Sequence, residues 1–236
     1  MCKLLHNTGE PLPQDSTEDY LPSTLIEAAR ELEFDYIACG WRPPLPISAP
    51  KITIKSNYPN VWSERYVEAG YIKRDPTISA SQKSLRPIAW TDELFSKARD
   101  LWGEAQDIGL KFGCAQSIRD GRGNRSMVTL ARTHEPISQA EIKSKTEKIV
   151  NLAVVVHEHF YVSMALAQQD KVATLTDREL EVLRWSADGK TAAEISMILP
   201  ISLNTVNFHL KNVMNKLSTP NKAAAVLYAT VNGLLD

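Results

Sequence analysis

The chain has 236 residues, enough for one large domain or, more naturally, for two domains with buried cores. Its hydrophobic fraction of 43% and charged fraction of 23% are typical of soluble globular proteins. The formal net charge of -1 excludes a global attraction to nucleic acid, so any DNA contact has to come from a local patch.

The cysteines and the hydropathy pattern predict a cytoplasmic protein. Cys2, Cys39 and Cys114 are odd in number and have no metal-ligand spacing, which argues against a disulfide framework. No apolar run is long enough for a signal peptide or a membrane span, so we expect no membrane partner. His157 and His159 are two residues apart and would point to different helix faces, so we expect no metal and no cofactor.

The N-terminal two thirds alternate helices with strands. Apolar periodicity predicts helices over residues 21–33, 92–108 and 138–168, and strands over 34–42, 51–57 and 88–90. Two further alternating segments, 114–120 and 126–133, read as a hairpin around DGRGN. Neighbouring strands with helices before, between and after them indicate an antiparallel sheet covered on both faces, an α+β fold.

One aromatic segment, residues 56–76, allows two interpretations. Tyr58, Trp62 and Tyr66 recur every four residues and share one helix face, as an ordinary packing stripe would. Their hydroxyl and indole groups need partners when buried, however, and the carboxylate of Asp75 follows closely. The mixture also suits a pocket for a ligand with a small polar head and an apolar body. Asp75 has a second available role, as the N-cap of a helix that starts with Pro76.

The C-terminal residues predict three capped helices. Thr176 with Glu179 and Thr191 with Glu194 form capping boxes, and Gly189 suits the end of the first helix. Ser202 caps a third helix that runs to about Leu217, and the tight turn before it makes a helix-turn-helix. We therefore divide the chain into a first domain at residues 1–166, a linker at 167–175 and a second domain at 176–236.

The third helix has the composition of a helix that reads the major groove. Val206, Leu210, Val213 and Leu217 form its inward stripe, and the opposite face has no acidic residue. Amides suit adenine edges, a lysine suits phosphate or guanine, and an exposed phenyl suits a thymine methyl. The alternative is a solvated helix in a protein-binding bundle. In that case an apolar phenyl would be exposed at the centre of a polar face, which is unfavourable unless a partner covers it. The predicted DNA contacts are Thr191, Asn204, Thr205, Asn207, Phe208, Lys211 and Asn212.

Charge balance predicts that this domain acts in pairs. From residue 172 onward, six basic side chains balance six acidic ones, so one copy would bind DNA weakly. We therefore expect a homodimer on a pseudo-palindromic site in double-stranded DNA. The last helix, which we expect to start at Pro220, is suited to packing against a second copy.

At this point both halves resemble a known family. TDRELEVLRWSADGKTAAEIS with ISLNTVNFHLKNVMNKL resembles the four-helix DNA-binding domain of LuxR-type regulators, with Glu179, Leu183 and Gly189 at characteristic positions. NYPNVWSERYVEAGYIKRDPT and PIAW resemble the acyl-homoserine-lactone-binding domain of quorum-sensing receptors. The resemblance implies an N-terminal α/β/α sandwich and a C-terminal all-α helix-turn-helix domain.

The resemblance also implies roles for particular residues. Trp62 would donate to the lactone carbonyl, Asp75 would accept the ligand amide N–H, and Tyr58 would donate to the acyl carbonyl. Pro76 and Gly113 match further family positions, whereas Asn207 stands where many members have a basic residue. Phe95 lacks the hydroxyl that some relatives carry at its position. The predicted ligand contacts are Tyr58, Trp62, Tyr66, Asp75, Thr77, Trp90, Phe95 and Thr129.

The predicted function is that of a quorum-sensing transcriptional regulator gated by an N-acyl-homoserine lactone, with RNA polymerase as a further expected partner. The alternative is an anti-activator that sequesters the signal or heterodimerises with a related regulator. An enzyme such as a lactone hydrolase needs a nucleophile or metal set, which we do not find in the sequence.

Overall fold

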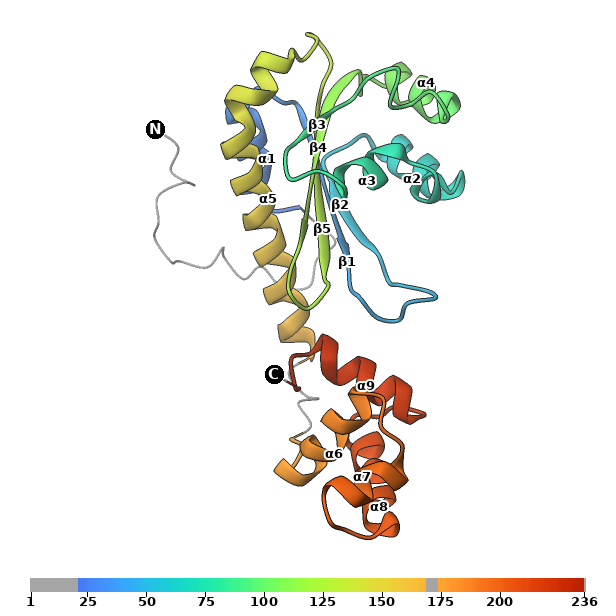
Figure 1. Cartoon of the computed structure of the whole chain (residues 1–236). Helices are drawn as coiled ribbons and strands as arrows, with labels where there is room; N and C mark the ends of the chain where they lie inside the picture. The colour runs from blue at the N-terminus through green and yellow to red at the C-terminus, as the bar shows by residue number, and fades with distance from the viewer. Residues whose placement is uncertain (1–20, 169–173, 236) are drawn as a thin grey trace. The chain divides into compact units, whose positions relative to one another are not determined.

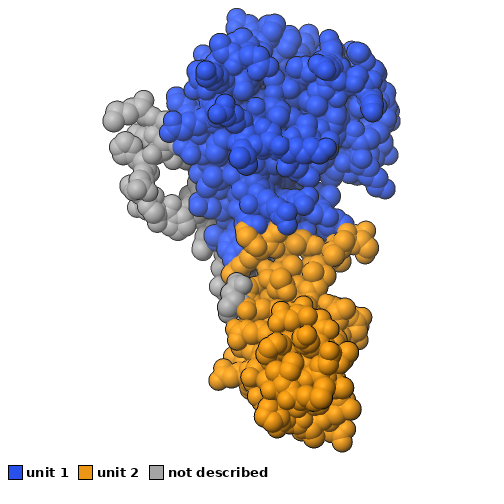
Figure 2. All heavy atoms as spheres, viewed as in Figure 1, with its two compact units in different colours: residues 1–43, 50–120, 124–164 blue, residues 44–49, 121–123, 165–236 orange. Residues whose placement is uncertain are grey.

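The structure is a computed structural model that describes residues 21–168 and 174–235. The chain divides into two compact units, one made of residues 1–43, 50–120 and 124–164 and the other of residues 44–49, 121–123 and 165–236 (Figure 2). Each unit has its own apolar clusters. Residues 169–173 of the predicted linker lie outside the described residues.

The N-terminal unit is built on a five-stranded antiparallel sheet. Its strands are β1 (Tyr36–Arg42), β2 (Thr53–Ser56), β3 (Ile88–Ala89), β4 (Phe112–Arg119) and β5 (Arg125–Arg132). Their order in the sheet is β2-β1-β5-β4-β3, and every neighbouring pair is antiparallel. The predicted hairpin and the antiparallel sheet are confirmed.

Helices cover both faces of this sheet. Figure 1 shows α1 (Ser23–Glu31) and the long α5 (Gln139–Gln168) on one face, and α2 (Asn60–Glu68), α3 (Pro76–Ser81) and α4 (Arg99–Asp107) on the other. A 3-10 turn, η2 (Tyr71–Lys73), joins α2 to α3. The predicted α/β/α sandwich is confirmed.

Strand alternation separates two apolar clusters on the two faces of the sheet. Val128 and Leu130 of β5 pack with α1 and α5, whereas Ala131 packs with the aromatic residues on the other face. Successive strand residues point to opposite faces, so one strand supplies both layers. The second cluster belongs to the face that carries α2, α3 and α4.

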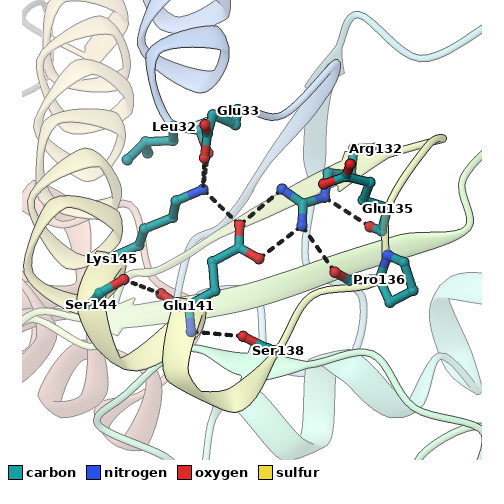
Figure 3. A network of polar contacts seen from close by, with 9 residues as sticks. All are labelled: Leu32, Glu33, Arg132, Glu135, Pro136, Ser138, Glu141, Ser144 and Lys145. Atoms are coloured by element: carbon teal, nitrogen blue, oxygen red, sulfur yellow. Dashed lines mark hydrogen bonds and ion pairs between the residues drawn. The ribbon is translucent and has the colours of Figure 1, made fainter.

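A network of charged residues ties the end of β5 to α5 and to the end of α1 (Figure 3). Arg132, only 4% exposed, donates from both Nη atoms to the two carboxylate oxygens of Glu141, each at 2.8 Å. Lys145 donates to Glu141 Oε1 at 2.7 Å and to the carbonyl of Leu32 at 2.8 Å. The buried cation therefore has a paired counter-charge.

Among the described residues from 174 onward, the C-terminal unit has the helices α6 (Asp177–Ala187), α7 (Ala192–Ile198), α8 (Leu203–Lys216) and α9 (Lys222–Val231). Both predicted capping boxes are present, and Ser202 caps α8 through the N–H of Thr205. Gly189 follows α6 with a φ of 84°, a value that suits glycine. The predicted helix-turn-helix is confirmed.

Three predicted element boundaries are wrong. The segment before Arg99 forms turns, so α4 starts later than residue 92. Tyr58 precedes α2, which begins at Asn60, and so lies outside the helix. The last helix begins at Lys222 and not at Pro220, because the side chain of Asn221 accepts from the N–H of Ala224 and so caps the helix.

Candidate ligand cavity and nucleic-acid interface

A cavity of about 510 Å³ lies on the face of the sheet that carries α2, α3 and α4. All eight predicted ligand contacts line it: Tyr58, Trp62, Tyr66, Asp75, Thr77, Trp90, Phe95 and Thr129. This volume is in the range of small-molecule sites, and the other lining side chains are mostly apolar. The structure thus brings residues from β5, α2, α3 and the loop before α4 into one wall.

Asp75 is the acidic side chain of the cavity and also the N-cap of α3. Its Oδ1 accepts from the N–H of Thr77 at 2.8 Å and from the Thr77 hydroxyl at 2.6 Å, while Oδ2 accepts from the Tyr66 hydroxyl at 2.9 Å. Burial raises the pKa of Asp75 even though these three donors lower it. A further donor from a ligand would favour the ionised form, so the capping role does not exclude a binding role.

A second polar group lies on the sheet. The Tyr58 hydroxyl donates to Thr129 Oγ1 at 3.3 Å, and Thr129 donates in turn to the carbonyl of Ala38 at 3.3 Å. Burial raises the pKa of the Tyr58 hydroxyl, which therefore remains a protonated donor at neutral pH. Both contacts are long, so a ligand carbonyl can compete for the Tyr58 proton.

Aromatic rings form the apolar walls in two groups. Trp62 lies with its ring centroid 5.9 Å from Tyr66 and 5.8 Å from Tyr71. Phe95 stacks on Trp102 at 4.4 Å with an angle of 8° between the rings, and Trp102 Nε1 donates to Asp92 at 2.8 Å. The phenyl of Phe95 therefore packs as a flat wall, a role that needs no hydroxyl.

Gly113 of β4 provides the space in which Trp90 lies. A Cβ at position 113 would stand 2.5 Å from Trp90 Cε3 and 2.7 Å from the carbonyl oxygen of Leu130. Both distances are shorter than non-bonded contacts of a Cβ atom, and the second contact is with backbone, which cannot move aside as a flexible side chain can. The glycine is thus required for the tryptophan to form part of the wall.

Sequence reasoning missed several residues of the cavity. Thr129 was predicted, and the two-residue repeat of a strand places Met127 and Arg125 on the same face. That signal was present in the sequence. The same repeat in the predicted strand 51–57 places Ile52 and Ile54 on one face, whereas no comparable signal marks Trp102.

A serine, a histidine and an aspartate also meet on the opposite face of β5, which the sequence did not reveal. Ser126 Oγ lies 2.8 Å from His157 Nδ1, and His157 Nε2 lies 3.3 Å from Asp120 Oδ2. Ser126 is 3% and His157 8% exposed, so both side chains are buried. The group satisfies buried polar atoms between β5 and α5.

In the C-terminal unit, the outer face of α8 is exposed as predicted. Asn204, Asn207 and Lys211 are exposed, and Phe208 is 61% exposed at the centre of this face. The inward stripe packs against the other helices, with Val206, Leu210 and Val213 buried. Asn212 is half-buried on the same helix.

Two of the predicted DNA contacts already have structural bonds. Thr191 Oγ1 donates to Glu194 Oε2 at 2.7 Å, and Thr205 Oγ1 lies 2.8 Å from the Ser202 hydroxyl. Lys216, near the end of α8, donates to the buried Glu179 at 2.7 Å and so holds α8 to the start of α6.

No group of three or more histidine, cysteine or acidic side chains with metal-binding geometry occurs among the described residues. Within the same residues, no helix combines the length and apolar character needed to cross a membrane.

A ligand cavity in one unit and a helix-turn-helix in the other define a ligand-binding transcription regulator. Residues 17–160 match the family described as "Autoinducer binding domain", and residues 173–229 match "Bacterial regulatory proteins, luxR family". The chain therefore belongs to the LuxR-type family of quorum-sensing transcriptional regulators.

Individual relatives agree with this assignment. The transcriptional activator protein AnoR of Acinetobacter nosocomialis is 41% identical over 225 residues, which cover 92% of this chain and 93% of the relative. The quorum-sensing regulator RhlR of Pseudomonas aeruginosa is 37% identical over 90% of this chain and 88% of its own. The solved structure of SdiA in complex with octanoyl-rac-glycerol has a TM-score of 0.74 and 33% identity, covering 90% of this chain and 87% of that one.

Proposed function

We propose that the chain binds an N-acyl-homoserine lactone in its N-terminal cavity and, as a homodimer, binds a pseudo-palindromic promoter site in the cytoplasm. The observation that carries the proposal is that Asp75 and Tyr58 line the same aromatic cavity. The carboxylate supplies the acceptor and the hydroxyl the donor that an amide-linked ligand requires. The domains proposed are residues 1–166 for the ligand, 167–175 as the linker and 176–236 for DNA.

The roles of the polar residues follow from their chemistry. Asp75 accepts the ligand amide N–H, Tyr58 donates to the acyl carbonyl, and Trp62 donates its indole N–H to the lactone carbonyl. Thr77 holds the carboxylate of Asp75, and Thr129 lies beside Tyr58 as a second polar contact. Tyr66, Trp90 and Phe95 supply apolar surface. An acyl chain suits the rest of the wall, which is largely aliphatic and aromatic.

Ligand binding would regulate the protein through the stability of its N-terminal unit. The cavity is surrounded by the same aromatic cluster that forms the core of one sheet face. A ligand at a hundred times its Kd stabilises the folded form by roughly 2.7 kcal/mol. The filled unit then dimerises and presents two copies of α8 to the two half-sites.

On DNA, the amides of Asn204 and Asn207 and the phenyl of Phe208 would read base edges in the major groove, while Lys211 contacts phosphate or guanine. Thr191, Thr205 and Asn212 would contact the backbone near helix ends. RNA polymerase is the further partner we propose for the DNA-bound dimer.

The balanced charge of the C-terminal residues favours a second candidate. Six basic and six acidic side chains from residue 172 onward would weaken DNA binding, as expected for an anti-activator that sequesters signal or heterodimerises with a related regulator. Replacing Asn204 and Lys211 with alanine discriminates the two functions, because activity is lost only if the protein acts on DNA.

The test measures soluble yield and binding to a two-fold-symmetric DNA site of about 20 base pairs, a length that spans two half-sites one helical turn apart. A panel of acyl-homoserine lactones of different chain length is added to the full chain, to Asp75→Asn and to the control Asp107→Asn, an exposed carboxylate outside the cavity. We expect one lactone to give a soluble DNA-binding dimer with the wild type and the control only. Lactone binding without DNA binding would favour the anti-activator, and indifference to every lactone would refute the ligand assignment.

A further inference from the structure

Three arginines line up across three strands on the cavity face of the sheet. Arg42 of β1 lies directly opposite Arg125 of β5, and Arg125 lies directly opposite Arg119 of β4. Directly paired strand residues point to the same face, and like charges in such pairs repel. Arg42 and Arg125 both line the cavity.

This row has no acidic partner among the described residues. Within residues 21–168 and 174–235, none of the three arginines forms an ion pair, and Arg125 Nη1 donates to the uncharged Gln82 Oε1, at 3.1 Å. Burial and the repulsion from Arg119 and Arg42 together lower the pKa of Arg125. An anion placed between Arg42 and Arg125 would relieve this repulsion.

The arginines lie far from the polar anchors of the same cavity. Arg125 and Thr129 are four residues apart on β5, which separates them by roughly 13 Å at about 3.3 Å per residue. Along α3, Asp75 caps the start and Gln82 follows the end, seven residues or roughly 10 Å further on. Because Arg125 donates to Gln82, the distance along α3 and the distance along β5 agree. Both place Arg42 and Arg125 at the end of the cavity opposite Asp75, where an acyl chain anchored at Asp75 would end.

We propose that Arg42 and Arg125 form an anion subsite at this far end, which takes a carboxylate at the end of the ligand's acyl chain. Asp75 is the single acidic residue among those that line the cavity, so the two ends have opposite charge. Guanidinium groups bind carboxylates in a bidentate manner, and Arg119 adds to the positive field from the neighbouring strand. The inference rests on the proposed function, because it assumes that the lactone head group lies at Asp75.

The test compares two acyl-homoserine lactones of equal chain length, one ending in a carboxylate and one in a methyl group. Their affinities for the full chain are measured by quenching of the cavity tryptophans or, where the apo chain is insoluble, by displacement of the bound methyl probe. We expect the wild type to prefer the carboxylate at least tenfold, with a preference that falls as salt is added. The double variant Arg42→Gln/Arg125→Gln should lose this preference and keep its affinity for the methyl probe. The control Arg99→Gln, an exposed arginine outside the cavity, should behave as the wild type.

The other outcomes separate the two levels of the inference. Equal affinity of the wild type for both probes would overturn the subsite while leaving the lactone assignment intact. Loss of methyl-probe affinity in the double variant without any carboxylate preference would mean that the arginine stems only cover the chain. Failure of both probes would refute the proposed function itself. A fatty acid of the same length is also tested. If its affinity falls in the arginine double variant but is unchanged in Asp75→Asn, the subsite is supported and its carboxylate ligand is a free fatty acid.

Discussion

Replacing Glu141 with glutamine tests how firmly the sheet is held to α5. The change removes the charge that pairs with the buried Arg132, whose side chain is 4% exposed, while Glu141 itself is 21% exposed. Removing one partner of a buried ion pair costs about 3–5 kcal/mol, because the other charge remains unpaired. The carbonyls of Glu135 and Pro136 still accept from Arg132, so we expect the lower end, about 3 kcal/mol.

The free energy of unfolding is measured by urea denaturation followed by tryptophan fluorescence. Four of the five tryptophans, Trp41, Trp62, Trp90 and Trp102, lie in the N-terminal unit, so the signal reports mainly on that unit. The matched control is Glu33→Gln, which removes the other carboxylate bound to Lys145. Glu33 is 72% exposed, so its loss should shift the midpoint far less. A Glu141→Gln effect no larger than that of the control would refute the reasoning.

The pH dependence provides a second check on the same variant. Burial raises the pKa of Glu141, but the hydrogen bonds from Arg132 and Lys145 outweigh it, and the pKa lies below its ordinary value of 4.5. A carboxyl with a depressed pKa stabilises the fold above its unfolded pKa and loses this contribution as pH falls through the folded value. The difference between wild type and variant should therefore be full at neutral pH and shrink below about pH 4.5.

Three further predictions concern the site and the second unit. Gly113→Ala should lower the free energy of unfolding by about 3 kcal/mol and abolish lactone binding, because the added Cβ displaces Trp90. Gly103→Ala, which has open space around its Cβ, should instead stabilise α4 by about 0.5–1 kcal/mol. Equal effects of the two variants in denaturation and in ligand titration would contradict this reasoning. Burial raises the pKa of Asp75 above its ordinary value of 3.8, so the ionised carboxylate destabilises the empty cavity as pH rises above that ordinary value. Apo Asp75→Asn should therefore gain stability relative to wild type as pH rises, while losing the lactone response, and a pH-independent difference in the urea midpoint would contradict this. Ser202→Ala should destabilise the second unit by about 1 kcal/mol through loss of the α8 cap, read from Trp185, and an unchanged midpoint would contradict the capping role.

Much of the fold followed from local patterns. The capping boxes at Thr176 and Thr191 and the glycine after α6 fix helix ends through backbone hydrogen bonds within a few residues, so sequence spacing was sufficient. The boundaries that failed were those with no such signal: the turns before Arg99 share the composition of the helix that follows, and Asn221 competes with Pro220 as the start of α9.

Some residues of the cavity could be predicted from the sequence, and others could not. Family resemblance and helical spacing indicated Asp75 and its aromatic neighbours, and all eight predicted residues line the cavity. Trp102 stacks on Phe95 only because α4 folds back over the sheet, and the pairing of Arg132 with Glu141 depends on where α5 crosses β5.

The sequence by itself therefore determined the order and type of the elements, the helix-turn-helix and several polar residues that line the cavity, because these depend on side chains close together in the chain. Only the tertiary structure decided which strands are neighbours. The β1–β5 register places Arg42 beside Arg125, two residues far apart in the sequence, and no local propensity encodes that pairing. The positive charge at the far end of the cavity therefore depends on how the strands pair and not on the sequence of any one segment.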